Sequence, residues 1–424
     1  MTTHYKLGPM ARQLTSGQKC NVTFIGDSTA AAGSSPRWGQ SIIKTWDLDW
    51  RERILLKATS SAPDEGFSTL NAPTTYSPGA SLPDSTVVPA GYIDCGYKAY
   101  ASYQPFNVIT RVISTVRQDY YRGDPWLNQP IRWRLMALGT SDPLEAIDFF
   151  DRDDNGTAAG GSIRRTDPIT AASGAWQVLE LTYAADSTPA MATKELLIQT
   201  TNTINHTGKQ FAYGGWSIAV NGKTDGVQMQ HVAVGGYTVK DHIPTALGGD
   251  STAFTDATRT AMFNYFDAWP DLIIIQLGIN METAESNDIR GAWGANLRTL
   301  MDWHVGLADA AGEASPQFML INPWATDSTE ARRADISAEL REIADERSDT
   351  GVLDLYQAVK DQLGSYSTWQ ATQLSDGVHQ STTGVVTFGE ISWNVITQAA
   401  STGGGLLRRG NLSGIIGTPL AGKF

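Results

Sequence analysis

The stretch NVTFIGDSTAAAG, residues 21–33, predicts a short strand, a sharp turn and a run that can begin a helix. Residues 21–26 are mostly apolar and do not alternate, which predicts a strand covered on both faces. Ser28 lies two residues after the end of this strand. A serine between a strand end and a helix start is exposed at the edge of the sheet, and its backbone N–H points to where an oxyanion would form. Ser28 is therefore a candidate nucleophile, with a helix-capping serine as the alternative.

Four further stretches share the character of the first strand, being short, apolar and closed by a turn residue. They cover residues 229–235, 271–278, 317–324 and 351–356. Segments with helical periodicity lie between the later ones, at residues 252–269, 287–311 and 326–349. Strand followed by helix, repeated along the chain, predicts a parallel sheet with helices on both faces.

Residues 96–225 have a different pattern, in which β segments alternate with loops rich in Asp, Gly, Thr and Ser. The segments cover residues 107–115, 131–137, 175–183, 195–201 and 211–220. This pattern is typical of a small antiparallel sandwich. We therefore predict an α/β domain at residues 1–95 and 226–400, an inserted β-sandwich at residues 96–225, and a C-terminal tail at residues 401–424.

Charge and apolar patterning exclude several classes of partner. A formal net charge of −12 opposes binding to a phosphate backbone, so no nucleic-acid partner is expected. No apolar run is long enough to cross a bilayer and the N-terminus lacks a signal peptide, which predicts a soluble protein without membrane contacts. Cys20 and Cys95 are the two cysteines of the chain. We interpret them as two unpaired interior residues in preference to one disulfide bridge between them.

A nucleophilic serine needs a base, and the chain has 6 histidines. His379 lies in the one D-x-x-H segment of the sequence, three residues after Asp376. On a turn these two side chains can meet, so that the carboxylate fixes the tautomer of the imidazole and stabilises its protonated form. His304 falls on an apolar helix face and is interpreted as a core residue. A helix cap remains the alternative for Asp376 and His379.

Two further strand ends carry hydrogen-bond donors. Gly235 and Gly236 follow the second parallel strand, and Gly278 and Asn280 follow the third. A glycine N–H and an asparagine amide at the carboxyl edge of a sheet are donors of the kind that an oxyanion hole requires.

The four segments, GDS, a glycine, G-x-N and D-x-x-H, resemble the four blocks of the SGNH (GDSL) hydrolases in order, over about residues 18–60 and 226–400. The resemblance implies a flavodoxin-like three-layer α/β/α fold with a five-stranded parallel sheet. It assigns Ser28 as nucleophile and oxyanion donor. Gly236 and Asn280 become the other oxyanion donors, and Asp376 and His379 complete the triad. Gly384 also agrees with the pattern. Tyr237 and Met281 depart from it, because many members carry Asp there.

The resemblance implies a carboxylic ester hydrolase that forms an acyl-enzyme and needs no metal or organic cofactor. Residues 170–185 resemble strands of carbohydrate-binding sandwich modules, so an acetylated poly- or oligosaccharide is the expected substrate. A sandwich that only forms one wall of the active-site cleft, or an oligomer contact, is the alternative for this insert. A polysaccharide O-acetyltransferase and a non-catalytic glycan-binding or virion protein are the alternatives. The loop composition and the tail would suit a phage virion, and association into a homo-oligomer is left open.

Asp151, Asp153 and Asn155 match the start of a calcium loop, D-x-D-x-N-G. The expected acidic residue at the twelfth position is Ser162. Structural calcium and a solvated acidic turn therefore both remain as interpretations.

Overall fold

The computed structural model describes residues 3–30, most of residues 222–324, and residues 330–401. Between residues 50 and 220 it describes mainly the backbone of the strands named below. Cys95 and residues 402–424 of the predicted tail lie outside the described residues, while Ser401 ends helix α9.

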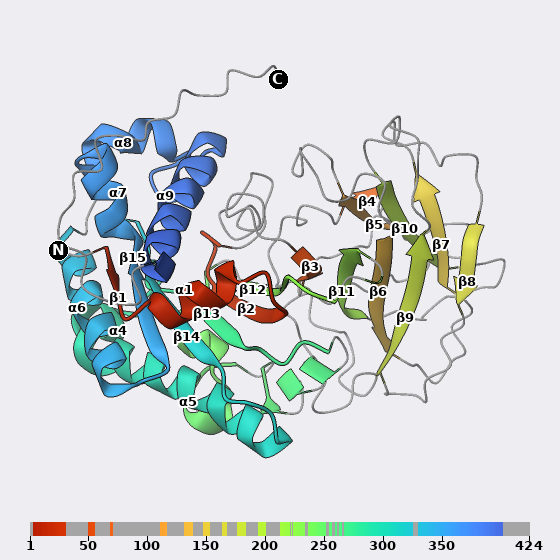
Figure 1. Cartoon of the computed structure of the whole chain (residues 1–424), viewed down its shortest axis with the longest axis horizontal. Helices are drawn as coiled ribbons and strands as arrows, with labels where there is room; N and C mark the ends of the chain where they lie inside the picture. Colours follow the sequence, from red (N-terminus) through yellow and green to blue (C-terminus); the bar gives the residue numbers. More distant parts are fainter. Residues whose placement is uncertain are drawn as a thin grey trace.

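Five parallel strands form the centre of the main sheet (Figure 1). In chain order they are β2 (Cys20–Gly26), β12 (Val227–Ala233), β13 (Leu272–Gln276), β14 (Gln317–Asn322) and β15 (Thr350–Asp354). Their spatial order is β15-β14-β13-β2-β12, with every neighbouring pair parallel. This is the flavodoxin-like order, in which the second strand lies outside the first. All five predicted strands and the predicted topology are confirmed.

Further strands extend this sheet at both edges. β1 (His4–Tyr5) pairs antiparallel with β15, and β3 (Trp50–Leu55) pairs parallel with β12. Beyond β3 the sheet continues with three antiparallel strands, β11 (Tyr213–Val220), β6 (Ile131–Leu138) and β9 (Trp176–Tyr183). The main sheet thus has ten strands.

A second, antiparallel sheet has the order β4-β5-β10-β7-β8. Its strands are β4 (Ser68–Leu70), β5 (Arg111–Val116), β7 (Ile147–Arg152), β8 (Ile163–Asp167) and β10 (Lys194–Thr200). The five β segments predicted in this region correspond to β5, β6, β9, β10 and β11, whereas β7 and β8 were not predicted. The packing of the insert as a sandwich and the boundaries at residues 96 and 225 stay predictions.

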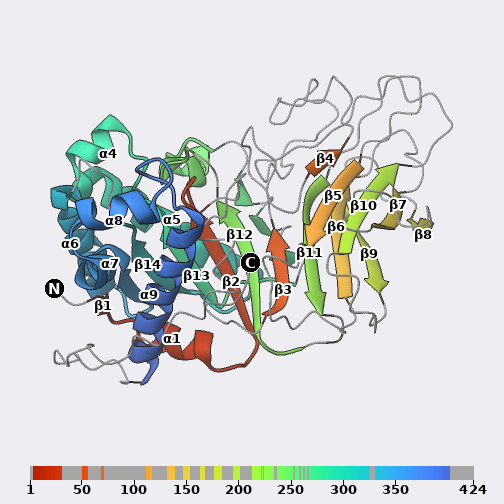
Figure 2. The ribbon, with the colours of Figure 1, turned by 90° about the horizontal axis from the view of Figure 1, so that it is seen from above.

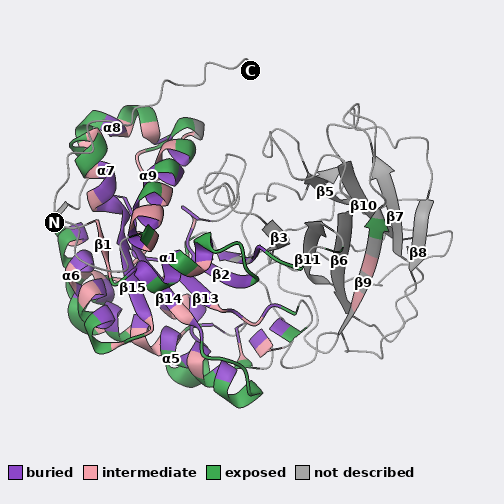
Figure 3. Cartoon of the chain, viewed as in Figure 1, coloured by how far each residue is buried: buried purple, intermediate pink, exposed green. Residues whose placement is uncertain are grey.

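Helices cover both faces of the parallel sheet (Figure 2). On one face α5 (Gly294–Ala311) and α6 (Glu330–Glu346) pack on Ile273 and Ile275 of β13. The other face carries α1 (Gly8–Thr15) and α9 (Thr382–Ser401), which contact each other. Because strand side chains alternate, both faces must be apolar, and all residues of β13 are buried (Figure 3).

Local irregularities refine the predicted helices. A π-helix, Ile289–Trp293, precedes α5, and the short helix α4 (Thr283–Asn287) precedes it. Two further helices, α7 (Leu355–Leu363) and α8 (Tyr366–Gln373), lead from β15 toward α9. The helix predicted at residues 252–269 lies partly outside the described residues. Among the described helices, none has the length and apolar character needed to cross a membrane.

Cys20 lies on β2 as a buried free thiol. Burial, with the nearby Asp271 carboxylate, raises the pKa of this thiol to about 12. A thiol with such a pKa stays protonated at neutral pH, so Cys20 is an unreactive core residue, as expected from the sequence.

Candidate active site

Ser28 occupies the turn that follows β2, at the carboxyl edge of the sheet. Asp27 before it is fully buried, and its Oδ1 accepts hydrogen bonds from Thr29 N (2.9 Å) and Thr29 Oγ1 (2.7 Å). Gln276, the last residue of β13, donates from Nε2 to Thr29 Oγ1 at 3.0 Å. The residues on both sides of Ser28 are therefore held by buried hydrogen bonds, which fixes the backbone of the turn.

His379 connects Ser28 to Asp376 in a chain of hydrogen bonds. The His379 Nε2 atom lies 3.0 Å from Ser28 Oγ, and the His379 Nδ1 atom lies 2.7 Å from Asp376 Oδ2. A carboxylate can only accept hydrogen bonds, so the His379 Nδ1–H group donates to Asp376. The unprotonated Nε2 atom then accepts a hydrogen bond from the Ser28 hydroxyl. The structure thus brings Ser28 into contact with His379, which lies 351 positions later in the chain, and His379 into contact with Asp376, three positions before it.

The loop between α8 and α9 carries Asp376 and His379, and several bonds hold it. Trp324, two residues after β14, donates from Nε1 to the Val378 carbonyl at 2.9 Å, and Tyr366 donates to the Gly377 carbonyl at 2.9 Å. Gly384 begins the return into α9, where a Cβ would lie 1.9 Å from the Gln373 carbonyl oxygen. Only glycine fits this close backbone approach, which explains the match of Gly384 to the family pattern.

Asp376 is held in its ionised form. Desolvation raises the pKa of this carboxyl, but hydrogen bonds from the His379 backbone and side chain and from Val378 N outweigh that effect and lower the pKa to about 2. Both His379 N (2.7 Å) and Val378 N (3.1 Å) donate to Oδ1, opposite the Oδ2 that accepts from the imidazole. Asp376 therefore remains a carboxylate at any pH near neutrality.

This lowered pKa predicts how stability depends on pH. The ordinary value is 3.8 and the folded-state value is about 2, so the ionised form favours folding. The contribution is present above about pH 4 and is lost as pH falls toward about 2. The urea midpoint of the wild type should fall relative to that of Asp376→Asn across this window. Parallel pH dependence of the two proteins between about pH 5 and pH 2 would contradict the assignment.

The predicted oxyanion donors lie on neighbouring loops. Asn280 Nδ2 donates to the Tyr237 carbonyl at 3.5 Å, a long bond that joins the loop after β13 to the loop after β12. Gly236 lies next to Tyr237 with a φ of +84°, which favours glycine, and it is exposed. The structure places Asn280 and Gly236 on the same two adjoining loops, while Gly235 lies outside the described residues. Their role as oxyanion donors stays a prediction.

A surface ion-pair cluster also joins these two loops. Lys240 Nζ lies 3.1 Å from Asp250 Oδ2 and 3.5 Å from Glu282 Oε2.

Tyr237 and Met281, which depart from the family pattern, are partly buried and pack against the core under α5 and α6. At these two positions apolar packing stands where many SGNH hydrolases carry a carboxylate.

His242 is a residue of this region that sequence reasoning missed. It is fully buried, its Nε2 lies 3.1 Å from the Gly26 carbonyl, and its ring stacks on Phe254 with centroids 5.7 Å apart. Burial first, and the positive charge of Arg259 second, lower the pKa of His242 to about 3. The ring is therefore neutral and donates Nε2–H to a carbonyl two residues before Ser28.

Replacing His242 with phenylalanine should keep the ring stack and remove this hydrogen bond. We expect the free energy of unfolding to fall by about 1–3 kcal/mol, the usual cost of leaving a buried polar group unpaired. Urea unfolding measures the change. His242→Ala, which also loses the packing, should cost more, and a loss below about 0.5 kcal/mol in His242→Phe would show that the bond does not support the turn.

The remaining candidates divide into a core residue and an untested site. His304 is buried on α5 and its Nδ1 lies 2.9 Å from the Leu300 carbonyl, which confirms it as a core histidine. Asp151 lies in strand β7, where it pairs with Leu196, while Asp153 and Asn155 lie outside the described residues. The part of the chain that the structure describes holds no cluster of three or more metal-ligating side chains. Structural calcium stays a prediction.

Comparison with known proteins was made at the level of sequence and of structure. No family model and no curated protein matches the sequence. Among solved structures, a peptidoglycan O-acetylesterase is similar over 94% of this chain and 96% of its own, with a TM-score of 0.55 at 14% identity.

Weaker similarities concern parts of the chain. The catalytic domain of Streptococcus pneumoniae peptidoglycan O-acetyltransferase A has 17% identity over 41% of this chain and 80% of its own, with a TM-score of 0.26. A family two carbohydrate esterase from Cellvibrio japonicus has 12% identity over 72% of this chain and 98% of its own, also with a TM-score of 0.26. The strand order and the similarity over nearly the whole chain together show that this protein has the SGNH hydrolase fold.

Proposed function

We propose that this protein is a serine esterase that hydrolyses short acyl esters, O-acetyl groups above all, on a polysaccharide. The observation that carries the proposal is the hydrogen-bonded chain from Ser28 Oγ through His379 to Asp376, at 3.0 Å and 2.7 Å. This arrangement of nucleophile, base and orienting carboxylate is recognised by its geometry on many unrelated folds. Its position at the carboxyl edge of the parallel sheet is where open α/β sheets bind ligands.

The chemistry would proceed in two halves. Ser28 Oγ attacks the ester carbonyl while His379 Nε2 takes its proton, and the imidazolium then protonates the leaving alcohol. Water attacks the acyl-enzyme in the second half, with the same imidazole as base. The carboxylate of Asp376 stabilises the imidazolium in both halves. The Ser28 and Gly236 backbone N–H groups and the Asn280 amide are the proposed donors to the oxyanion.

A small acyl group on a sugar is the proposed substrate. The whole-chain similarity is to a peptidoglycan O-acetylesterase, and it extends over the strands between residues 50 and 220 as well as the parallel sheet. Acetyl transfer to a sugar hydroxyl would use the same serine chemistry, so the fate of the acyl group must be measured.

The proposal is tested with p-nitrophenyl esters of increasing chain length and with acetylated polysaccharides. We expect kcat/KM to be highest for the acetate and to fall by about tenfold or more at the octanoate. Acetate release from acetylated xylan and O-acetylated peptidoglycan shows whether water is the acceptor. Acetyl groups appearing on an added oligosaccharide would identify a transferase instead. If no ester is turned over in a Ser28-dependent way, the esterase proposal is wrong and the alternative of a non-catalytic glycan-binding protein is favoured.

A further inference from the structure

The turn that carries Asp376 and His379 is closed by its own hydrogen bonds. The Ser375 backbone N–H and the Ser375 hydroxyl both donate to the His379 carbonyl, at 2.7 Å and 3.1 Å. Within the turn, Asp376 Oδ1 accepts from the backbone N–H groups of Val378 and His379. These bonds fix Asp376 relative to His379, but they do not reach the strand that leads to Ser28. The distance between His379 and Ser28 therefore depends on what holds the turn against the sheet.

Two aromatic side chains hold this turn from outside it. Trp324 Nε1 donates to the Val378 carbonyl and the Tyr366 hydroxyl donates to the Gly377 carbonyl, each at 2.9 Å. The two carbonyls belong to the two residues that immediately precede His379. Trp324 is fully buried, so its bond to the turn is shielded from water. The position of the imidazole is thus tied to the indole of Trp324 and to the phenol of Tyr366.

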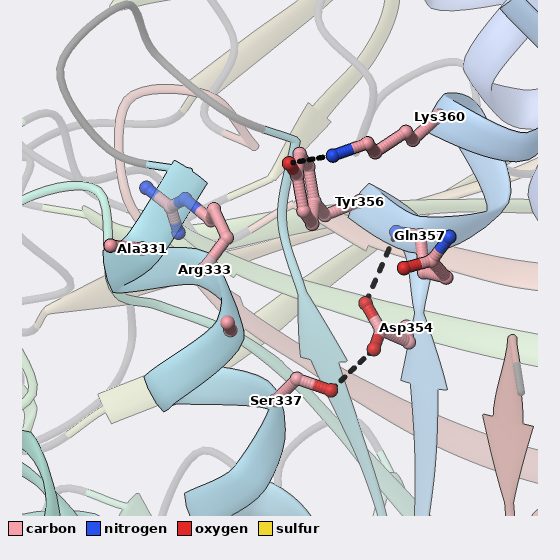
Figure 4. A pocket seen from close by; sticks show the side chains of 8 residues that line it. Ala331, Arg333, Ser337, Asp354, Tyr356, Gln357 and Lys360 are labelled. Atoms are coloured by element: carbon pink, nitrogen blue, oxygen red, sulfur yellow. Dashed lines mark hydrogen bonds between the residues drawn. The ribbon is translucent and has the colours of Figure 1, made fainter. Parts of the chain in front are cut away.

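The strand end that leads to Trp324 is anchored in the sheet. Asn322, the last residue of β14, is fully buried and donates from Nδ2 to Asp354 Oδ1 at 2.9 Å. The Asp354 carboxylate, at the end of β15, also accepts from the Ser337 hydroxyl of α6 and from Gln357 N of α7, where these elements line a small pocket (Figure 4). Trp324 follows Asn322 by two residues, so it starts from a point that β14, β15, α6 and α7 fix together.

We propose that Trp324 is a positioning residue that sets the distance between His379 Nε2 and Ser28 Oγ, which is 3.0 Å. β14 pairs with β13, and β13 pairs with β2, the strand that leads to Ser28. Through Trp324, His379 is therefore held by the same sheet that holds Ser28. Loss of the indole bond leaves the bonds within the turn in place, so Asp376 and His379 shift away from Ser28 as one unit.

Two tryptophan variants separate the indole hydrogen bond from the packing of the ring. Trp324 and Trp369 are both buried and both contact Phe388 of α9, with ring centroids 5.2 Å and 5.7 Å away. Trp324 Nε1 bonds to the Val378 carbonyl, whereas Trp369 Nε1 has no hydrogen-bond partner among the described residues. Trp324→Phe and Trp369→Phe therefore make the same chemical change in one aromatic cluster, and the first of them removes a bond to the turn.

The contact is measured without turnover, by NMR of the full chain with ¹⁵N-labelled histidine, in which His379→Ala assigns the two ring signals of His379. Ser28→Ala gives the Nε2 signal of an imidazole that has lost the serine hydroxyl. In Trp324→Phe the Nε2 signal should move toward that position, while the Nδ1 signal, which reports the bond to Asp376, should stay. Trp369→Phe should leave both signals unchanged. If Trp324→Phe does not fold, Tyr366→Phe, which removes a single hydroxyl, should move the Nε2 signal in the same direction and decides the test.

Kinetics on p-nitrophenyl acetate measure the consequence for catalysis, and this part of the inference rests on the proposed function. In Trp324→Phe, kcat should fall by about tenfold while KM stays within about twofold of the wild type, because small misplacements of a general base slow proton transfer. Trp369→Phe should keep the wild-type kcat.

An unmoved Nε2 signal in Trp324→Phe, an equal shift in Trp369→Phe, or an unchanged kcat in an active enzyme would overturn the role of Trp324. A wild type that turns over no ester would overturn the proposed function instead, and the NMR comparison would still decide whether Trp324 holds His379 against Ser28.

Discussion

Ser28→Ala is expected to lower kcat/KM for p-nitrophenyl acetate by about 10⁴-fold to 10⁶-fold. The Oγ atom that would form the acyl-enzyme is then missing, and water must attack the ester with help from the oxyanion donors alone. The alanine fits the turn, because the bonds that fix it run from Asp27 to Thr29 and Gln276 and do not use the Ser28 side chain. Steady-state kinetics with the same ester measures the loss.

Ser16→Ala is the matched control for this variant. Ser16 is exposed after α1, and its hydroxyl donates to the Gln13 carbonyl. It precedes the amino end of β2, whereas Ser28 follows the carboxyl end of the same strand. Its kcat/KM should equal that of the wild type. If Ser28→Ala folds, as judged by circular dichroism and its urea midpoint, and retains more than about a tenth of the activity, another group is the nucleophile.

His379→Ala is expected to lower kcat/KM by a similar factor, about 10⁴-fold or more, because the Ser28 hydroxyl loses its proton acceptor. Residues that act as one unit are not additive, so the double variant with Ser28→Ala should be no slower than either single variant. The kinetics of the three proteins on one ester provide the comparison.

His4→Ala is the control for this second prediction, since His4 lies on edge strand β1 beside β15. Two independent tenfold losses that multiply in the double variant would show that Ser28 and His379 act separately. That result would contradict the hydrogen bond of 3.0 Å between them as the basis of catalysis.

The parallel sheet could be predicted from sequence because its strands are buried on both faces and so read as continuous apolar runs. β13, with Leu272 to Gln276 all buried, is the clearest case. The pairing of Ser28 with His379 followed from a scarcity of candidates, since one D-x-x-H segment exists in the chain. Local signals were sufficient for both.

Other parts left no local signal. α9 is rich in Thr, Val, Ile and Gly, which have low helix propensity, and its packing against α1 is not visible in its own sequence. His242 was missed because its partner, the Gly26 carbonyl, is a backbone atom 216 positions away. The burial of Arg333, which is 1% exposed, also has no local signal, because it depends on the packing of α6 on the sheet, whereas charged residues are ordinarily exposed.

Covalent labelling tests the central claim most directly. The full chain is incubated with a fluorophosphonate that reacts with activated serines, digested and mapped by mass spectrometry, alongside Ser28→Ala and His379→Ala. The account predicts one stoichiometric adduct on the peptide that contains Ser28, absent in Ser28→Ala and at least about a hundredfold slower to form in His379→Ala. An unlabelled wild type, or an adduct on another residue that persists in Ser28→Ala, would contradict it.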